Sequence, residues 1–506
     1  PSSAASDVYK RQHIRWSGNN EISLQEAQMR TFSNFVWMFL QTEGDYNFSS
    51  GSRGRGNLSS TANPYFLFPQ IYNFRYNIYS SEWPVANRAI ELYLQKKSEN
   101  EGWERQINGL SNNEKANLLL EKHTFKELLA DVEQRNLQNN IVGLEASRLF
   151  ARSEINMGVD AFRDSLYAML KRNTFLNIKF ENMLDTLGEM SRTDLYSYLK
   201  EWEQLTPLPF YSIGEPELTK VVNKGGEEFF VLKVLVSNNS DYDGIIQMNV
   251  LQNGWWYQPM EDPRARKKVE IAAHTSKEFV SVWEEQIRDV EINTMVSGNL
   301  PYMIRQSIGN VKQERNKIVK DTIYTLPESS LEMPGEVIVD NEDSTLFVLS
   351  TPAVVGLLPK WLDKVEDTSF KYSGISWWRA PLQWTATTNA KYYGKYIRSA
   401  YVIKSGDGSQ TATWKIPVPE AGQYELYYHV FKDDELRWND RLQGEYHFRV
   451  AYDSEMEDAY INLRKANEGW EQLGTYYFSA DTVRVMLTDE CKLRSVTADA
   501  VKIVKR

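Results

Sequence analysis

Near the end of the chain, residues 469–478 read GWEQLGTYYF, residues 482–487 read TVRVML and residues 496–503 read VTADAVKI. Apolar and polar side chains largely alternate within these stretches, and polar residues separate them. Because successive side chains of a β-strand point to opposite faces, the alternation predicts three short strands that each bury one face. Such strands are typical of the layers of a β-sandwich, which we therefore predict for the C-terminal part of the chain.

Further motifs extend this β-rich part toward the middle of the chain. They are VIVDNED at 337–343, YGKYIRSA at 393–400, TWKIP at 413–417 and GQYELY at 422–427. Together with the three closing strands, they resemble the C-terminal domain of golvesins, which is also appended to xanthan-lyase-type bacterial enzymes. The resemblance runs from 336 to 506. It implies a β-sandwich that binds carbohydrate or a cell surface and carries no catalytic machinery.

Composition sets limits on the class of protein. At 506 residues the chain predicts about three domains of roughly 150 residues each. Its net charge of −10 argues against a nucleic-acid partner, since such partners favour a basic surface. The single cysteine, Cys491, excludes an internal disulfide framework and a multi-cysteine metal site. No apolar run approaches the roughly 18 residues of a membrane-spanning helix, so no span is expected in this sequence.

The first residues do not read as native protein. Residues 2–12, SSAASDVYKRQ, reverse-translate codon by codon into a transposase-based sequencing adapter. We therefore treat residues 1–12 as an adapter scar and exclude them from fold reasoning. The native sequence is expected to start near His13 and to continue upstream of it, as in an environmental sequence fragment.

The remaining pattern predicts a multidomain chain that is first helical and then β-rich. We expect an N-terminal α-helical domain followed by two antiparallel β-sandwich domains. Residues 229–236 and 245–250 are predicted to pair as a hairpin across an Asp-Gly turn. The expected helices are 21–40, 85–95, 113–133, 140–156, 159–171, 180–190 and 192–204, and the expected domains are 13–211 (helical), 212–325 (Ig-like sandwich), 326–335 (linker) and 336–506 (golvesin-type sandwich).

A second resemblance begins in the helical part and covers residues 140–330. Its marks are MGVDAF at 157–162, TDL at 193–195 and PFY at 209–211. This pattern resembles the end of the catalytic domain of gluzincin aminopeptidases (the M1 family) and the β-domain that follows it, as in aminopeptidase-like proteins of Bacteroidota. Catalysis in that family needs H-E-x-x-H on one helix, which binds zinc and supplies a general base.

None of the five histidines completes that zinc motif. His123, after Glu121 and Lys122, comes nearest, and a surface histidine on a charged helix is the simpler interpretation. The neighbourhood where the family has a catalytic tyrosine reads NIVG at 140–143. We therefore predict no catalytic residue, no metal ligand and no cofactor in this sequence.

Aromatic residues in the last domain form the candidate glycan-binding site. Sugars present apolar C–H faces that stack on flat rings, and Arg379, Gln383 and Asn389 could contact hydroxyls. Adjacent tryptophans in a strand would point to opposite faces, so only one of the pair could join a platform. Packing in the sandwich core is the alternative for every member of the set. The candidate residues are Trp377, Trp378, Trp384, Tyr392 and Tyr393.

The combined prediction is a non-catalytic C-terminal fragment of a bacterial envelope or secreted protein. Domain resemblance implies an extracytoplasmic location (periplasm, cell surface or secreted), and a polysaccharide or cell-surface glycan is the expected partner. Two alternatives stay open. A zinc aminopeptidase would carry H-E-x-x-H upstream, and the periplasmic portion of a transporter permease fusion would carry apolar runs of about 20 residues there.

Overall fold

The chain folds into two compact units in the computed structural model. Unit 1 comprises Pro1–Glu99 and Asp160–Ser197, and unit 2 comprises Asn100–Val159 and Tyr198–Arg506. The described residues are 29, 76–94, 101–173, 176–205, 207–222, 225–251, 262–309, 311–315, 319–329, 331, 335–350, 370–375, 380–432 and 444–506.

Unit 1 is a small helical body with a two-stranded parallel sheet. Its helices bury apolar side chains at helical spacing: Phe162, Leu166 and Leu170 all point inward from one face of α8. The ring of Tyr93 packs edge-on against Phe162, with a centroid distance of 6.1 Å. The elements are β1 (Tyr76–Tyr79), α3 (Ala86–Leu94), α8 (Val159–Arg172), β2 (Leu176–Lys179), α9 (Phe180–Ser191) and α10 (Leu195–Lys200); α8 starts one residue before this unit, and α10 runs on into unit 2.

Unit 2 begins with shorter helices than the sequence pattern predicted. The single helix expected at 113–133 is wrong, because Thr124 starts a new helix there. Ser111 and Thr124 each form a capping box with a glutamate three residues later, and this fixes two separate helix starts. The elements are α4 (Glu101–Asn108), α5 (Asn112–Leu120), α6 (Phe125–Ala130), α7 (Gln138–Met157) and the 3-10 turn η1 (Glu201–Glu203).

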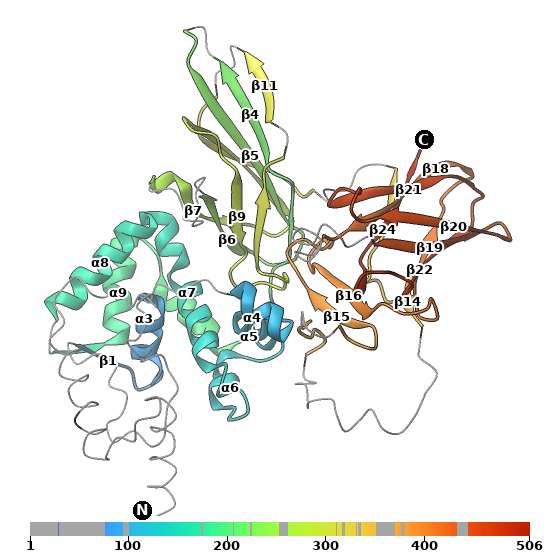
Figure 1. Ribbon diagram of the computed structural model, residues 1–506. Helices are drawn as coiled ribbons and strands as arrows, with labels where there is room; N and C mark the ends of the chain where they lie inside the picture. Colours follow the sequence, from blue (N-terminus) through green and yellow to red (C-terminus); the bar gives the residue numbers. More distant parts are fainter. Residues whose placement is uncertain are drawn as a thin grey trace, which may run out of the picture. The chain divides into compact units, whose positions relative to one another are not determined.

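Two sheets pack face to face in residues 211–327 of unit 2, the part for which an Ig-like sandwich was expected (Figure 1). Their inward side chains, among them Val234, Ile246 and Phe279, form one core. One sheet has the order β11-β4-β5-β8-β12, with β3 beside β5; the other has the order β10-β9-β6-β7. The strands are β3 (Tyr211–Ile213), β4 (Glu217–Val222), β5 (Glu228–Asn238), β6 (Gly244–Leu251), β7 (Arg266–Ile271), β8 (Thr275–Trp283), β9 (Asp289–Asn293), β10 (Met303–Ser307), β11 (Val311–Arg315) and β12 (Thr322–Pro327), with the turn η2 (Pro263–Ala265).

The predicted hairpin between residues 229–236 and 245–250 is wrong. These residues lie in β5 and β6, which belong to opposite sheets: β5 pairs with β3, β4 and β8, whereas β6 pairs with β7 and β9. The buried amide of Asn238 donates to the carbonyl oxygens of Tyr242 (2.7 Å) and Ile271 (3.0 Å) where the chain crosses. Residues 239–243 therefore carry the chain from one sheet to the other instead of closing a hairpin.

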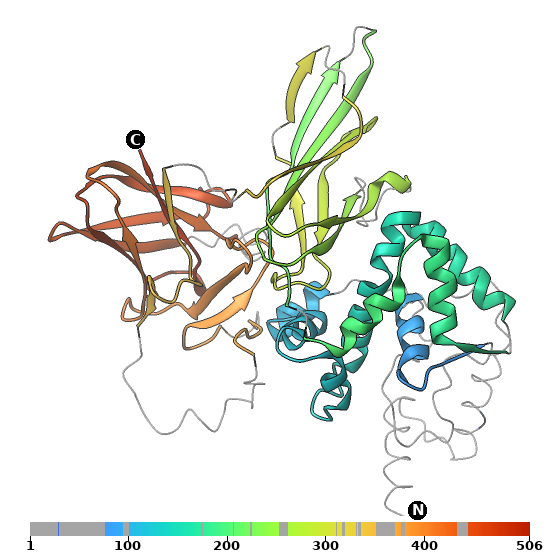
Figure 2. The same ribbon diagram turned by 180° about the vertical axis from the view of Figure 1, so that it is seen from behind.

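The last part of unit 2 is also a sandwich, and its two larger sheets form separate layers in Figures 1 and 2. Trp414, Tyr428, Phe448 and Phe478 are buried between them. The sheet orders are β13-β24-β18-β21, β14-β17-β22-β19-β20 and β15-β16-β23. The strands are β13 (Glu336–Val339), β14 (Phe347–Leu349), β15 (Thr385–Thr388), β16 (Ser399–Lys404), β17 (Thr411–Pro417), β18 (Gly422–Val430), β19 (Glu445–Tyr452), β20 (Glu455–Asn462), β21 (Gly469–Phe478), β22 (Thr482–Thr488), β23 (Ser495–Ala498) and β24 (Val501–Lys505).

Residues from the three parts of unit 2 meet around Leu110, at the turn between α4 and α5. Leu110 clusters with Leu300, Tyr372 and Ala386. The hydroxyl of Thr388 donates to the carbonyl oxygen of Gly109 at 2.8 Å. The C-terminal sandwich is therefore fixed to the helices by buried contacts rather than joined to them by one linker alone.

The predicted fold class is confirmed: a helical region from 86 to 203 is followed by several antiparallel sheets. The expected helix at 21–40 lies outside the described residues except for Met29. The domain bounds stay predictions. Among the described residues, no helix combines the length and apolarity required to cross a membrane.

Candidate functional site

The structure separates the predicted glycan-binding residues into different environments. Trp377 and Trp378 lie outside the described residues. Trp384 is half-buried against the sandwich core, and its indole N–H has no hydrogen-bond partner within the described part of the chain. Tyr392 is only 6% exposed and packs edge-on against Phe431, with a centroid distance of 4.7 Å. Tyr393 is half-buried and faces other aromatic rings.

Tyr393 meets two rings that the sequence did not single out as binding residues. Its centroid lies 5.0 Å from that of Trp470 and 5.8 Å from that of His429. His429 and Trp470 are register partners on β18 and β21, with centroids 5.1 Å apart. The three rings therefore converge on one side of the sheet.

The same side of the sheet carries a charged and a phenolic group. The ammonium group of Lys502, on β24, lies 4.9 Å from the centroid of Trp470 and 5.4 Å from that of Tyr427. Tyr427 and His429 alternate along β18 with Tyr428, which points into the core, so they face outward. We call this surface the aromatic face; its residues are Tyr393, Tyr427, His429, Trp470 and Lys502.

A buried carboxylate anchors the aromatic face from beneath. Asp499 is fully buried and accepts hydrogen bonds from the backbone N–H of Tyr393, at 3.1 and 3.2 Å. Its Oδ2 lies 2.9 Å from Nδ1 of His429. Burial raises the pKa of Asp499, and the neighbouring His429 opposes this shift. One side chain thus holds two members of the face in place.

Two further ionisable groups near Asp499, Asp340 and Arg398, are partly buried. Burial and the nearby Asp499 carboxylate raise the pKa of Asp340 well above its ordinary value. Burial lowers the pKa of Arg398 to about 10, although Asp499 partly opposes this shift. Arg398 donates from Nη1 to the carbonyl oxygen of Ala390 at 2.8 Å. Arg398 thus holds the loop that carries Tyr393 through the backbone of Ala390.

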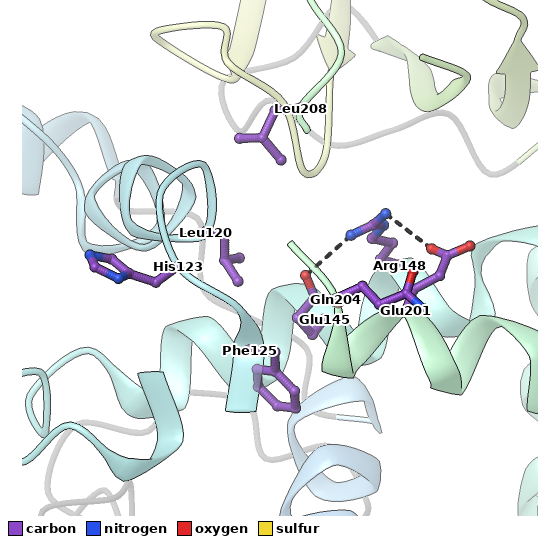
Figure 3. A pocket seen from close by; sticks show the side chains of 8 residues that line it. All are labelled: Leu120, His123, Phe125, Glu145, Arg148, Glu201, Gln204 and Leu208. Atoms are coloured by element: carbon purple, nitrogen blue, oxygen red, sulfur yellow. Dashed lines mark hydrogen bonds and ion pairs between the residues drawn. The ribbon is translucent and has the colours of Figure 1, made fainter. Parts of the chain in front are cut away.

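A second cluster of ionisable groups lies in the helical part of unit 2 (Figure 3). Arg148 on α7 lies between Glu145 (3.5 Å) and Glu201 (3.0 Å), as the dashed lines in the figure show. Burial raises the pKa of Glu145, and Arg148 opposes the shift. The adjoining space, which His123 also lines, holds about 10 Å³, at the lower limit for one water molecule (roughly 10–15 Å³). This space is too small for a ligand. Arg148 and Glu201 also line a larger neighbouring space of about 340 Å³, together with Arg152 and Asp241.

Metal binding finds no support in the described ranges. Among those residues, no group of three or more His, Cys, Asp or Glu side chains is arranged so that it could hold a metal ion. His447 contacts two carboxylates, Glu490 at 3.1 Å and Asp458 at 2.9 Å, through its two ring nitrogens. Cys491 is half-buried, and burial raises the pKa of its thiol, so the unreactive protonated form is favoured.

Comparison with known proteins confirms the resemblance of the last domain. Residues 378–505 match the family model of the Golvesin C-terminal domain. No curated protein sequence matches the chain. The family match therefore covers the aromatic face but not the helical or Ig-like parts.

Two of the solved structures that match are distant from this chain. Legionella pneumophila aminopeptidase A, in complex with aspartic acid, matches with 15% identity and a TM-score of 0.18, over 35% of this chain and 18% of that chain. Bacteroides uniformis β-glucuronidase 2 matches with 11% identity and a TM-score of 0.17, over 62% of this chain and 31% of that chain. The chain thus spans a third or less of either protein, and likenesses this distant carry no argument about activity.

Proposed function

We propose that the golvesin-type part of this chain binds a polysaccharide or cell-surface glycan through the aromatic face, and that the protein works outside the cytoplasm. The observation that carries the proposal is the convergence of Tyr393, His429 and Trp470 on one side of a sheet, with centroids 5.0–5.8 Å apart. The helical and Ig-like parts have no assigned chemistry and act as a support for this surface.

The chemistry of the aromatic face suits a sugar. The rings offer flat apolar surface for the C–H groups of a pyranose, while Tyr427, His429 and Lys502 offer polar atoms for hydroxyls. Outward positions on one strand are two residues apart, which is about 6.6 Å, so the polar side chains of β18 follow the sheet in a row. Gln472 on β21 is a register partner of Tyr427 and adds an exposed amide to that row.

The rings are also held in fixed positions, which reduces the entropy lost on binding. Asp499 orients His429 and the backbone of Tyr393, and Lys502 is held by an ion pair of 2.8 Å with Glu336. A surface prepared in this way can meet a sugar without rearranging.

Isothermal titration of the full chain against a panel of polysaccharides tests the proposal. Trp470→Ala should weaken binding roughly tenfold, since loss of a stacked ring costs about 1.4 kcal/mol. Trp470→Phe keeps a ring and should retain most of the affinity. Tyr324→Ala, which removes an exposed ring from β12 of the Ig-like part, is the matched control and should bind normally.

Two results would count against the proposal. Absence of heat with every polysaccharide would leave the aromatic face a structural feature. Equal binding by the parent chain and Trp470→Ala, with unchanged thermal unfolding, would move any glycan site to another surface.

A further inference from the structure

The opposite sheet of the golvesin-type sandwich carries an exposed tyrosine that lies flat on a histidine. Tyr460 on β20 is 58% exposed. Its ring stacks on the imidazole of His447 on β19, with centroids 4.9 Å apart and an interplanar angle of 8°. The two residues are register partners across the strand pair. One ring face of Tyr460 is thus covered by the imidazole, and much of the rest of the side chain meets solvent.

His447 is fixed in the plane that supports this stack. Its side chain is only 10% exposed, and each ring nitrogen faces a carboxylate oxygen: Oδ1 of Asp458 at 2.9 Å and Oε2 of Glu490 at 3.1 Å. The imidazole cannot turn without losing one of these contacts. Tyr460 is therefore a rigid aromatic platform, and little conformational entropy is lost when a ligand stacks on it.

The two carboxylates define the chemistry of the ligand. Asp458 and Glu490 are 58% and 60% exposed. Within the described part of the chain, the second oxygen of each carboxylate has no hydrogen-bond partner. A flat ring beside free acceptors fits a pyranose that stacks its C–H face and donates its hydroxyls. Arg449 lies 3.9 Å from Asp458 and balances part of the negative charge, which favours a polyhydroxyl ligand over a cation.

This platform and the aromatic face lie on opposite sides of one core. Tyr460 belongs to the sheet β14-β17-β22-β19-β20, and Trp470 belongs to the sheet β13-β24-β18-β21. Phe448 on β19 and Tyr428 on β18 pack together between the two sheets, with centroids 4.9 Å apart. One polysaccharide segment cannot stack on both outer faces at the same point.

We propose that Tyr460, Asp458 and Glu490 form a second glycan-contact site, so that one copy of the chain bridges two polysaccharide segments. The inference rests on the proposed glycan binding of the aromatic face and adds bivalence to it. A bivalent protein cross-links a polymer that carries many repeats of the same epitope. The chain would then gather matrix strands together in addition to attaching to them.

The test combines affinity electrophoresis with turbidity and uses the full chain. The probes are mixed-linkage β-glucan, galactomannan and polygalacturonate. With a polysaccharide that retards it, the parent chain should cause turbidity that is greatest at an intermediate ratio of protein to polymer. Tyr460→Ala and Trp470→Ala should each retain partial retardation and lose turbidity, and the double variant should lose both. Tyr460→Phe, which keeps the ring, should restore turbidity, and Tyr324→Ala should behave as the parent does.

The outcomes separate this inference from the proposed function. Turbidity that survives Tyr460→Ala and disappears with Trp470→Ala overturns the second site and leaves the aromatic face standing. Loss of all retardation with Tyr460→Ala alone overturns bridging, because it leaves a single site on the other sheet. Absence of retardation of the parent chain by every probe overturns both proposals. Unchanged thermal unfolding of Tyr460→Ala keeps each result independent of folding.

Discussion

Nδ1 of His429 lies 2.9 Å from Oδ2 of Asp499, a carboxylate that is fully buried. The same carboxylate accepts the backbone N–H of Tyr393, so it connects β18 with the loop that brings Tyr393 to the sheet. The shape of the aromatic face therefore depends on a residue that never reaches solvent.

Asp499→Ala should lower the free energy of unfolding by about 3 kcal/mol, because it leaves the N–H of Tyr393 and the imidazole of His429 without their acceptor. Glycan binding should weaken in parallel. Chemical unfolding monitored by tryptophan fluorescence measures the first effect, and titration the second. Asp499→Asn keeps an acceptor and should cost less, and the exposed Asp481→Ala is the control. A stable Asp499→Ala variant with normal binding would contradict this account.

Arg148 forms ion pairs with two glutamates, Glu145 and Glu201. Its removal should lower the free energy of unfolding, because Glu145 is buried. In Arg148→Ala the carboxylate of Glu145 stays buried without its cation, so we expect a loss of about 3–5 kcal/mol in chemical unfolding. Adding Glu145→Gln to that variant removes the uncompensated charge and should restore most of the stability. Arg135→Ala, at an exposed position, is the matched control. If the double variant is no more stable than Arg148→Ala, buried charge is not the cause.

Local sequence patterns predicted the helices and strands of this fold better than they predicted which of these elements pair with one another. Alternation identified the strands around Trp470, and the order of motifs identified the last domain. The break between α5 and α6 was also readable, since Thr124 and Glu127 have capping-box spacing. The crossing after β5 was not readable, because the amide of Asn238 is satisfied by Ile271, a residue 33 positions away.

In the candidate site, too, local residues were predicted but their tertiary neighbours were not. Aromatic content drew attention to Tyr393, yet the rings that it meets come from strands 36 and 77 residues further along the chain. Outward alternation in β18 is a signal that could have identified Tyr427 and His429. The pairing of β18 with β21, which adds Trp470, depends on the tertiary fold and leaves no mark in the local pattern.

The close approach of Gly374 to the helical turn makes it a test of how unit 2 is held together. A Cβ atom on Gly374 would lie 1.8 Å from the carbonyl oxygen of Ile107, so Gly374→Ala must push these backbones apart. We expect a loss of about 1–3 kcal/mol, the usual cost of overpacking. Hydrogen exchange should also accelerate around Leu110, where the loops meet. Gly309→Ala, whose Cβ would meet nothing within 4 Å, is the control. Unchanged exchange in Gly374→Ala would argue against this contact.

Glu91 should make the stability of unit 1 depend on pH. Burial raises the pKa of its carboxyl from 4.5 to about 7, and Arg88 only partly opposes the shift. Because the folded-state pKa is raised, the stability contributed by the protonated form is complete below about pH 4.5 and is lost as the pH rises through 7. The span corresponds to roughly 3 kcal/mol. Glu91→Gln removes this titration. The stability of α3, measured by hydrogen exchange, should therefore increase at pH 8 and change little at pH 4.5. The exposed Glu82→Gln should keep the pH dependence of the parent chain. A parent-like slope in Glu91→Gln would mean that Glu91 stays ionised in the folded protein and that Arg88 outweighs burial.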